Sequence, residues 1–172
     1  IDPALNTTND GSNYITYLFD NLLRVDKDGK IAPSMAEKYE VSDDGLTWTF
    51  HLRDGLKWSD GSDFTAGDFV YSWQRMVDPE VAAPYAETVL GMVDGYEDAI
   101  GNPDANGNTT TTPDVTKLKV EAPDDKTFVV HMAKPTPYFD KLATFAALSP
   151  VKKDVVESNP DGWTLDPKTY IS

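Results

Sequence analysis

The sequence predicts an α+β fold in which an antiparallel sheet of two hairpins is covered by helices. Two pairs of segments alternate apolar and polar residues, as half-buried strands do, and the segment after Thr65 carries apolar residues at helical spacing. The length of 172 residues suits one domain of ordinary size. With 40% hydrophobic and 26% charged residues, the chain can form a core.

The first hairpin is predicted between residues 39 and 53. One strand places its apolar residues on one face, and the residues between them, Thr47 to Arg53, on the other. Its apolar positions are Leu46, Trp48, Phe50 and Leu52. Tyr39 and Val41 indicate the partner strand, and residues 43–45 read as the connecting turn.

The second hairpin is predicted between residues 118 and 132. Its two strands alternate in the same way on either side of a turn at residues 123–125. Their apolar positions are Leu118, Val120, Ala122, Phe128, Val130 and Met132. We expect the four strands to form one antiparallel sheet with one covered face.

Helices are expected to supply the cover. Thr65 and Asp68 have the spacing of a capping box, which predicts a helix that begins after Thr65. The apolar stripe of this helix is Phe69, Val70, Trp73, Met76 and Val77.

Further helices are predicted on weaker patterns. One would run from about 13 to 23 behind Ser12 as its N-cap, with an apolar stripe at Tyr14, Tyr17, Leu18 and Leu22. A second would begin near Pro84 and continue towards Ile100. Residues 26–30 read as a turn, residues 101–114 as a surface loop, residues 138–145 as a short apolar run and residues 151–158 as a short amphipathic helix.

Charge and cysteine content exclude several classes of protein. The formal net charge of -14 disfavours nucleic acid and anionic membrane surfaces as partners, because both attract basic proteins. The absence of cysteine excludes a disulfide scaffold, a thiolate metal site and a cysteine nucleophile. No apolar run approaches the ~20 residues of a membrane-spanning helix. The acidity alone names no ligand.

Neither metal nor cofactor binding is expected. Asp26, Asp28 and Glu37 imitate an EF-hand loop, but the glycine falls at the fourth position instead of the sixth and Pro33 intrudes, so a plain turn is the better interpretation. The oxygen-rich segment 104–108 lacks a distal bidentate acid and is interpreted as a loop.

No catalytic cluster stands out, so we predict that the chain is not an enzyme. His51 and His131 fall on the polar faces of predicted strands, where a surface or cross-strand histidine is expected. Neither a G-x-S-x-G elbow nor a phosphate-cradling glycine loop occurs. With 29 acidic residues, pairs of carboxylates are expected by chance, so a glycan hydrolase has no specific support.

Tyr85 differs from the other aromatic residues, most of which are expected in the core. It follows Pro84 at a predicted helix start and lies outside the main apolar stripe. Two interpretations remain open: a partly buried residue at the helix cap, and a tyrosine that faces a ligand at the rim of a cleft.

The stretch from Trp48 to Pro79 resembles one protein family. It contains the strings WTFHLR (48–53), KWSDG (57–61), TAGDFVYSWQR (65–75) and VDP (77–79), and this combination is similar to the family 5 solute-binding proteins of ABC importers, which include the oligopeptide-binding proteins. Further matching pieces are DP (2–3), LFDNLL (18–23), AE (36–37), VSDDG (41–45), PYA (84–86), TF (127–128), PYF (137–139) and SPV (149–151).

The resemblance implies that the chain is the N-terminal fragment of a longer protein with a two-lobed fold of the type II periplasmic binding proteins. It divides the chain into residues 1–19, an initial segment of the first lobe; residues 20–145, a small extra domain of that lobe; and residues 146–172, a truncated return segment towards the lobe. The second lobe and the signal or lipidated cysteine of the family would lie outside the chain.

The resemblance also carries five ligand-binding positions. Tyr85 aligns with the tyrosine that faces the peptide in oligopeptide binders. Thr7, Thr8 and Asn9 correspond to the loop that supplies backbone contacts. Phe145 takes the place of a histidine found in some members, which removes a polar contact and questions the usual oligopeptide selectivity.

The function implied is capture of a peptide or peptide-like solute outside the cytoplasm, by a cell-surface lipoprotein or a periplasmic protein. The expected protein is a monomer that delivers its solute to the membrane subunits of an ABC permease. The fragment alone holds one wall of the cleft, so we expect it to bind weakly or not at all. Two alternatives stay open: the same family binding a dipeptide, nickel chelate, oligosaccharide or haem, and a stand-alone adhesive or structural module suggested by the Thr-rich loop 101–114.

Overall fold

The computed structural model describes residues 1–165 and 170–172 and is built around one four-stranded antiparallel sheet. The strand order is β3 (Ala36–Val41), β4 (Thr47–Leu52), β6 (Thr127–His131) and β5 (Val120–Asp124). Trp48 lies opposite Val41 on one side and Val130 on the other. Both predicted hairpins and their pairing into one sheet are therefore confirmed. The turn of the second hairpin lies at residues 125–126 instead of 123–125, because β5 continues to Asp124, which pairs with Thr127.

The alternation in β4 separates two environments. Trp48, Phe50 and Leu52 are buried, whereas the residues between them are half-buried. The rings of Phe50 and Phe128 lie 6.4 Å apart between neighbouring strands. The period of two along β4 thus places the large apolar side chains in the main core.

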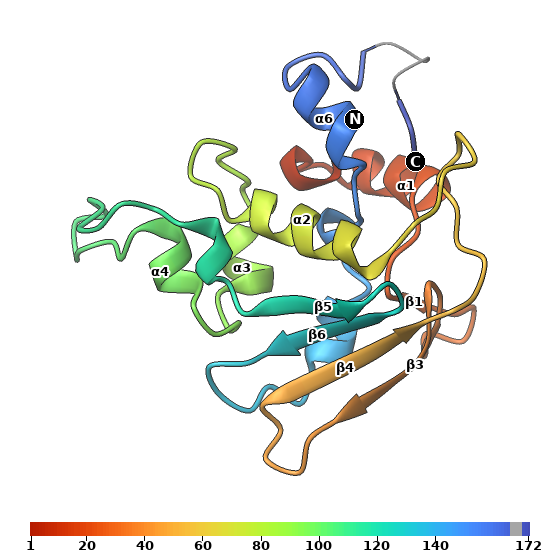
Figure 1. Cartoon of the computed structure of the whole chain (residues 1–172), viewed down its shortest axis with the longest axis horizontal. Helices are drawn as coiled ribbons and strands as arrows, with labels where there is room; N and C mark the ends of the chain where they lie inside the picture. Colours follow the sequence, from red (N-terminus) through yellow and green to blue (C-terminus); the bar gives the residue numbers. More distant parts are fainter. Residues whose placement is uncertain (166–169) are drawn as a thin grey trace.

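Helix α2 (Ala66–Met76) covers the sheet beside β5 and β6 (Figure 1). Its capping box is present, and the Thr65 N–H donates to Asp68 Oδ2 at 2.8 Å. Trp73 is fully buried and meets Phe128 edge to face with ring centroids 4.9 Å apart. The predicted stripe of α2 is confirmed, with Phe69, Trp73 and Met76 buried.

The prediction for the first helix is wrong in its bounds. Helix α1 spans Asn9–Leu18, with Thr8 as its N-cap, and the backbone turns extended at Phe19. Ile15 is the helix residue that enters the core, whereas Tyr17, placed in the predicted stripe, is 88% exposed. Thr8 caps the helix because its Oγ1 accepts the Gly11 N–H at 3.0 Å, so the cap lies four residues before Ser12.

The residues after α1 form a small ribbon in place of the expected last helical turn. Strand β1 (Leu23–Val25) pairs antiparallel with β2 (Ile31–Pro33). The predicted turn between them is confirmed, since Asp26 accepts the Gly29 N–H at 3.0 Å.

The single helix expected from Pro84 towards Ile100 is two short helices. Helix α3 (Ala86–Leu90) ends at Gly91, and α4 (Tyr96–Ile100) begins after Gly95. Gly95 has φ +77°, a left-handed conformation that interrupts a helix and that glycine adopts without steric cost. The apolar spacing continues across the break, which is why the pattern alone indicates one helix.

Short elements complete the chain. They are the 3₁₀ turns η1 (Pro3–Leu5), η2 (Val115–Lys117) and η3 (Ala146–Leu148) and the helices α5 (Phe139–Leu142) and α6 (Lys153–Ser158). The segment 101–114 is a mostly exposed loop, as predicted. Within the described part of the chain, every helix is too short or too polar to cross a bilayer.

A second, smaller core joins α1 to the C-terminal segment. It contains Ile15, Phe19, Val151, Val156 and Trp163. Figure 1 shows α1 and α6 together on the side of α2 that faces away from the sheet. This core holds α1 against residues that are more than 130 positions away in the sequence.

Candidate functional site

The five residues expected to bind a ligand line one hollow of about 290 Å³, called here the Tyr85 hollow. Thr7, Thr8 and Asn9 come from the segment that leads into α1, Tyr85 from the start of α3 and Phe145 from the segment before η3. The remaining lining residues are Asn6, Ser12, Thr88 and Ala147. Three segments far apart in the sequence therefore share one concave surface.

The wall at residues 6–9 is shaped by the Asn6 side chain. Asn6 Nδ2 donates to the Thr8 carbonyl and to Ser12 Oγ, both at 3.0 Å, and Asn6 Oδ1 accepts the Thr8 N–H at 3.3 Å. A Cβ on Gly11 would lie 1.9 Å from Asn6 Oδ1, so glycine at this position makes room for the asparagine. An asparagine two residues before a threonine N-cap is a turn signal that is present in the sequence.

The opposite wall is aromatic. The rings of Tyr85 and Phe145 meet edge to face, with centroids 5.3 Å apart and an interplanar angle of 72°. Tyr85 is half-buried at the N-cap position of α3, and Phe145 is 37% exposed. Tyr85 is thus a partly buried residue at a helix cap, and it also lines the hollow.

The Tyr85 hollow carries hydroxyl, amide and aromatic groups, and none of its lining residues is charged. Such a surface can accept and donate hydrogen bonds to a neutral polar ligand and can pack against apolar groups. It offers neither an acid–base pair nor a set of carboxylates for a metal ion. The chemistry that it supports is reversible binding.

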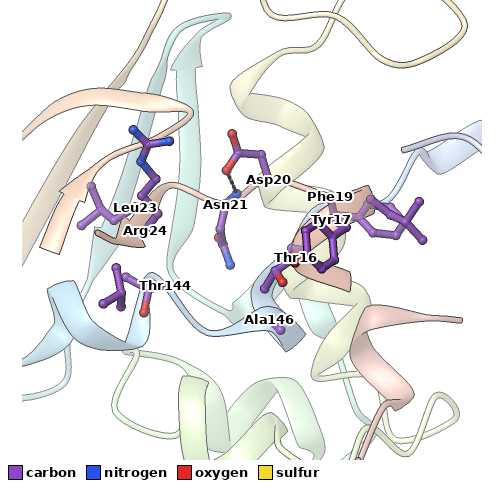
Figure 2. Close-up of a pocket in the computed structure, with 12 residues that line it drawn as sticks. Thr16, Tyr17, Phe19, Asp20, Asn21, Leu23, Arg24, Thr144 and Ala146 are labelled. Atoms are coloured by element: carbon purple, nitrogen blue, oxygen red, sulfur yellow. Dashed lines mark hydrogen bonds between the residues drawn. The ribbon is translucent and has the colours of Figure 1, made fainter. Parts of the chain in front are cut away.

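A larger hollow of about 640 Å³ lies at the other end of α1 and was not anticipated from the sequence. We call it the Asn21 hollow; Figure 2 shows Asn21 in it, with Thr144 on one side and Thr16 of α1 on the other. The buried Asn21 side chain is satisfied, because Nδ2 donates to the Phe145 carbonyl at 2.8 Å and Oδ1 accepts the Leu22 N–H at 2.9 Å. None of the five predicted site residues lines this hollow.

The histidines are cross-strand residues, as predicted. His131 Nε2 lies 2.8 Å from Glu121 Oε1, and His51 Nε2 lies 3.6 Å from Glu40 Oε1. Each contact joins neighbouring strands of the sheet, and neither histidine lines the Tyr85 hollow.

The two oxygen-rich segments are closed turns. Asp26 Oδ1 accepts the N–H groups of Asp28 and Lys30 at 2.8 and 2.9 Å, and Asp104 Oδ1 accepts those of Asn106 and Asn108 at the same distances. In residues 1–165 and 170–172, no three His, Cys, Asp or Glu side chains are grouped so that they could hold a metal ion. These carboxylates stabilise loops.

Comparisons with known proteins place the chain beside bacterial binding proteins. Residues 30–172 match the family model described as bacterial extracellular solute-binding proteins, family 5 middle. The chain is 44% identical over 154 residues to the periplasmic oligopeptide-binding protein OppA of Salmonella typhimurium. This match covers 89% of the chain and 26% of that protein. It is 37% identical over 164 residues to the probable deoxycholate-binding periplasmic protein YgiS of Escherichia coli, with 95% and 29% coverage.

A solved structure agrees with these sequence matches. The crystal structure of Haemophilus influenzae OppA in complex with the peptide RPPGFSPFR superposes with a TM-score of 0.87 at 40% identity. The match covers 99% of the present chain and 31% of that protein. The chain therefore spans roughly a third or less of the length of these relatives.

Proposed function

The chain belongs to the bacterial extracellular solute-binding proteins of family 5, and from this we propose that it supplies one wall of the ligand cleft in an oligopeptide-binding protein of an ABC importer. The proposed protein is a monomer outside the cytoplasm that passes its peptide to the membrane permease. Attachment through a lipid and free residence in the periplasm both fit this role.

The observation that carries the proposal is the convergence of Thr7, Thr8, Asn9, Tyr85 and Phe145 on one neutral hollow. A relative with 40% sequence identity was crystallised with a nine-residue peptide, which supports a peptide as the solute. Neutral hydroxyl and amide groups suit the backbone of a peptide, because they hydrogen-bond its amides whatever its side chains are.

The proposed mechanism is capture without chemistry. Hinge closure of two lobes buries the peptide, and the closed form is delivered to the permease. In this scheme Tyr85 presents a ring face and a hydroxyl to the peptide, while Phe145 holds the Tyr85 ring edge to face and contributes no hydrogen bond. Phe145 thereby makes this corner of the cleft more apolar than a histidine would.

We further propose that residues 1–19 and 146–172 belong to the first lobe and residues 20–145 to a small extra domain. The second core supports this division, because Ile15 and Phe19 pack there with Val151, Val156 and Trp163. The sheet and α2 form the larger core, which holds most of the apolar residues between these two segments.

The test is calorimetric titration of the full-length protein with short peptides. Tyr85→Ala is expected to weaken binding by about tenfold or more, because a partly buried tyrosine at a binding surface commonly contributes about 1.4 kcal/mol or more. Tyr138→Ala is the matched control, since Tyr138 is also the N-cap residue of a short helix but does not line the hollow. Equal affinities of the two variants contradict the assignment of Tyr85.

The choice of titrant tests the solute class. Because one relative is named as a probable deoxycholate-binding protein, deoxycholate is titrated beside the peptides. Binding of peptides with no binding of deoxycholate supports the proposal. Binding of deoxycholate alone overturns the peptide assignment while the family membership stands.

A further inference from the structure

The Asn6 side chain uses all of its hydrogen-bonding capacity within its own turn. Its Nδ2 donates to the Thr8 carbonyl and to Ser12 Oγ, and its Oδ1 accepts the Thr8 N–H and, at 3.2 Å, the Thr8 hydroxyl. Two donated and two accepted bonds are the full complement of an asparagine side chain. Asn6 lines the Tyr85 hollow, but it has no hydrogen-bonding group left over for a ligand.

Gly11 provides the space that Asn6 occupies. A Cβ on Gly11 would lie 1.9 Å from Asn6 Oδ1 and 2.8 Å from Thr8 Oγ1. Gly11 lies in the first turn of α1 and does not have a left-handed backbone, so its conformation does not require glycine. Alanine is the better helix former. The close approach of the Asn6 side chain is therefore the physical reason for glycine at this position.

The turn leaves backbone groups free at the wall of the hollow. Among residues 1–165 and 170–172, the N–H and C=O of Thr7 and the N–H of Asn9 have no hydrogen-bond partner. Both residues are exposed, and both line the Tyr85 hollow. An extended peptide can pair with such groups through its own main chain, whatever its side chains are.

Hydrogen bonds of Asn6, and not burial, hold the turn in place. The turn lies between two buried residues, Ala4 in η1 and Ile15 in α1. Asn6 itself is half-buried, and residues 7–9 are exposed. A turn that is rigid before the solute arrives loses less conformational entropy on binding, which increases affinity.

We propose that Asn6 is a positioning residue for solute recognition. Without contacting the solute, it holds the backbone of residues 7–9 in the conformation that pairs with the main chain of a peptide, and Gly11 gives it room to do so. This inference rests on the proposed function. Because the main chain is common to all peptides, loss of Asn6 weakens the binding of different peptides by the same factor.

Calorimetric titration of the full-length protein tests the inference. Asn6→Ala, Gly11→Ala and the double variant are each titrated with RPPGFSPFR, the peptide in the relative's structure, and with tetra-alanine. Asn13→Ala is the matched control, since Asn13 is also an exposed asparagine in the first half of α1 but does not line the Tyr85 hollow.

Asn6→Ala is expected to weaken the binding of both peptides by about tenfold, and Asn13→Ala is expected to leave it within about twofold of the parent. If Gly11 acts through Asn6, the double variant binds as Gly11→Ala does. Unchanged affinity in Asn6→Ala overturns the inference, and so do losses that multiply in the double variant. A loss for one peptide alone also overturns it. If the parent binds neither peptide, the proposed function fails and the inference fails with it.

Amide relaxation measured by NMR without peptide separates positioning from a general loss of structure. The Thr7 amide should have an order parameter of about 0.85 in the parent and below about 0.6 in Asn6→Ala, while the Ile15 amide stays rigid in both. Weakened binding with a rigid Thr7 shows that Asn6 does not act through the turn. Weakened binding with a mobile Ile15 shows that the variant loosens α1 itself. Either result overturns the inference and leaves the proposed function standing.

Discussion

Asp2 and Arg75 form a two-point ion pair between the start of the chain and the last turn of α2. Arg75 Nη2 lies 2.6 Å from Asp2 Oδ2, and Nη1 lies 3.3 Å from Oδ1. The Arg75 side chain is 12% exposed and the Asp2 side chain is 8% exposed. Asp2 Oδ1 also accepts the Ala4 N–H at 3.0 Å. The segment that leads to the Tyr85 hollow is thus fixed to the helix that covers the sheet.

Arg75→Ala is expected to lower the free energy of unfolding by about 3 kcal/mol, because it leaves the buried carboxylate of Asp2 without its partner charge. Urea unfolding followed by tryptophan fluorescence measures this. The control is Glu157→Gln, which removes an exposed ion pair with Lys153 and should change stability by less than about 0.5 kcal/mol. Similar losses in the two variants would show that burial of the Asp2–Arg75 pair is unimportant.

Trp73→Ala is expected to cost about 3–5 kcal/mol, because it leaves a cavity where a large ring was buried. Trp73 is fully buried between Phe128 and Phe139, and its Nε1 donates to the Leu148 carbonyl at 3.2 Å. Trp73→Phe keeps much of the volume and loses the hydrogen bond, so a smaller loss of about 1–2 kcal/mol is expected. An unchanged urea midpoint for the alanine variant would refute the packing of Trp73 between Phe128 and Phe139.

Gly95 and Gly29 allow the cost of a steric clash to be separated from the cost of backbone strain. Their φ angles are +77° and +75°, but a Cβ on Gly95 would lie 1.9 Å from the Lys117 carbonyl oxygen, whereas a Cβ on Gly29 would meet nothing within 4 Å. Gly29→Ala should therefore cost about 1 kcal/mol from the left-handed backbone alone. Gly95→Ala should cost about 3 kcal/mol, since the contact must also be relieved. Thermal unfolding of both variants checks the difference, and equal shifts in Tm would contradict it.

Asp60 and Asp68 are expected to act on stability in opposite directions as the pH falls. Hydrogen bonds from Lys152 and then Ser62 hold the pKa of the Asp60 carboxyl well below its ordinary value of 3.8. Burial raises the pKa of Asp68 above 3.8, against an opposing hydrogen bond from the Thr65 N–H. Asp60 therefore stabilises the folded state above its unfolded pKa, and this stabilisation is lost as the pH falls towards its folded pKa. For Asp68 the sign is reversed: its stabilisation of the folded state is present below its unfolded pKa and is lost as the pH rises through its folded pKa.

The measurement is urea unfolding of the parent chain, Asp60→Asn and Asp68→Asn between about pH 6 and about pH 2.5. The stability advantage of the parent over Asp60→Asn should shrink as the pH falls. The parent should gain stability relative to Asp68→Asn over the same range. A parallel response of the two variants would mean that the surroundings of one carboxyl are not those described.

The sheet could be predicted from the sequence because strand alternation was strong and local. In β4 every second residue is large and apolar, and a period of two has no helical counterpart. The first helix could not be placed in the same way. Its end at Leu18 depends on the extended backbone at Phe19 and on the pairing of β1 with β2, and neither leaves a periodic signal in residues 9–25.

The Tyr85 hollow could not be predicted from local patterns, since Thr8, Tyr85 and Phe145 are brought together by tertiary packing. The resemblance to a family supplied these positions, and the geometry places them around one hollow. Asn6 and Ser12 were missed because each is a polar residue in a polar segment, and Thr88 because it stands beside the apolar residues of α3. The Asn6–Thr8 spacing was the one local signal available.

The absence of charged side chains around the Tyr85 hollow has a kinetic consequence, because the chain as a whole carries a net charge of -14. If this wall binds peptides as proposed, the charge of the chain acts at long range, so it should speed the encounter with a cationic peptide, and added salt should reduce that on-rate. The neutral wall acts only after contact, so the rate at which a bound peptide leaves it should hardly respond to salt. Ionic strength would then govern how often peptides arrive at this wall, while hydroxyl, amide and aromatic contacts govern how long they stay.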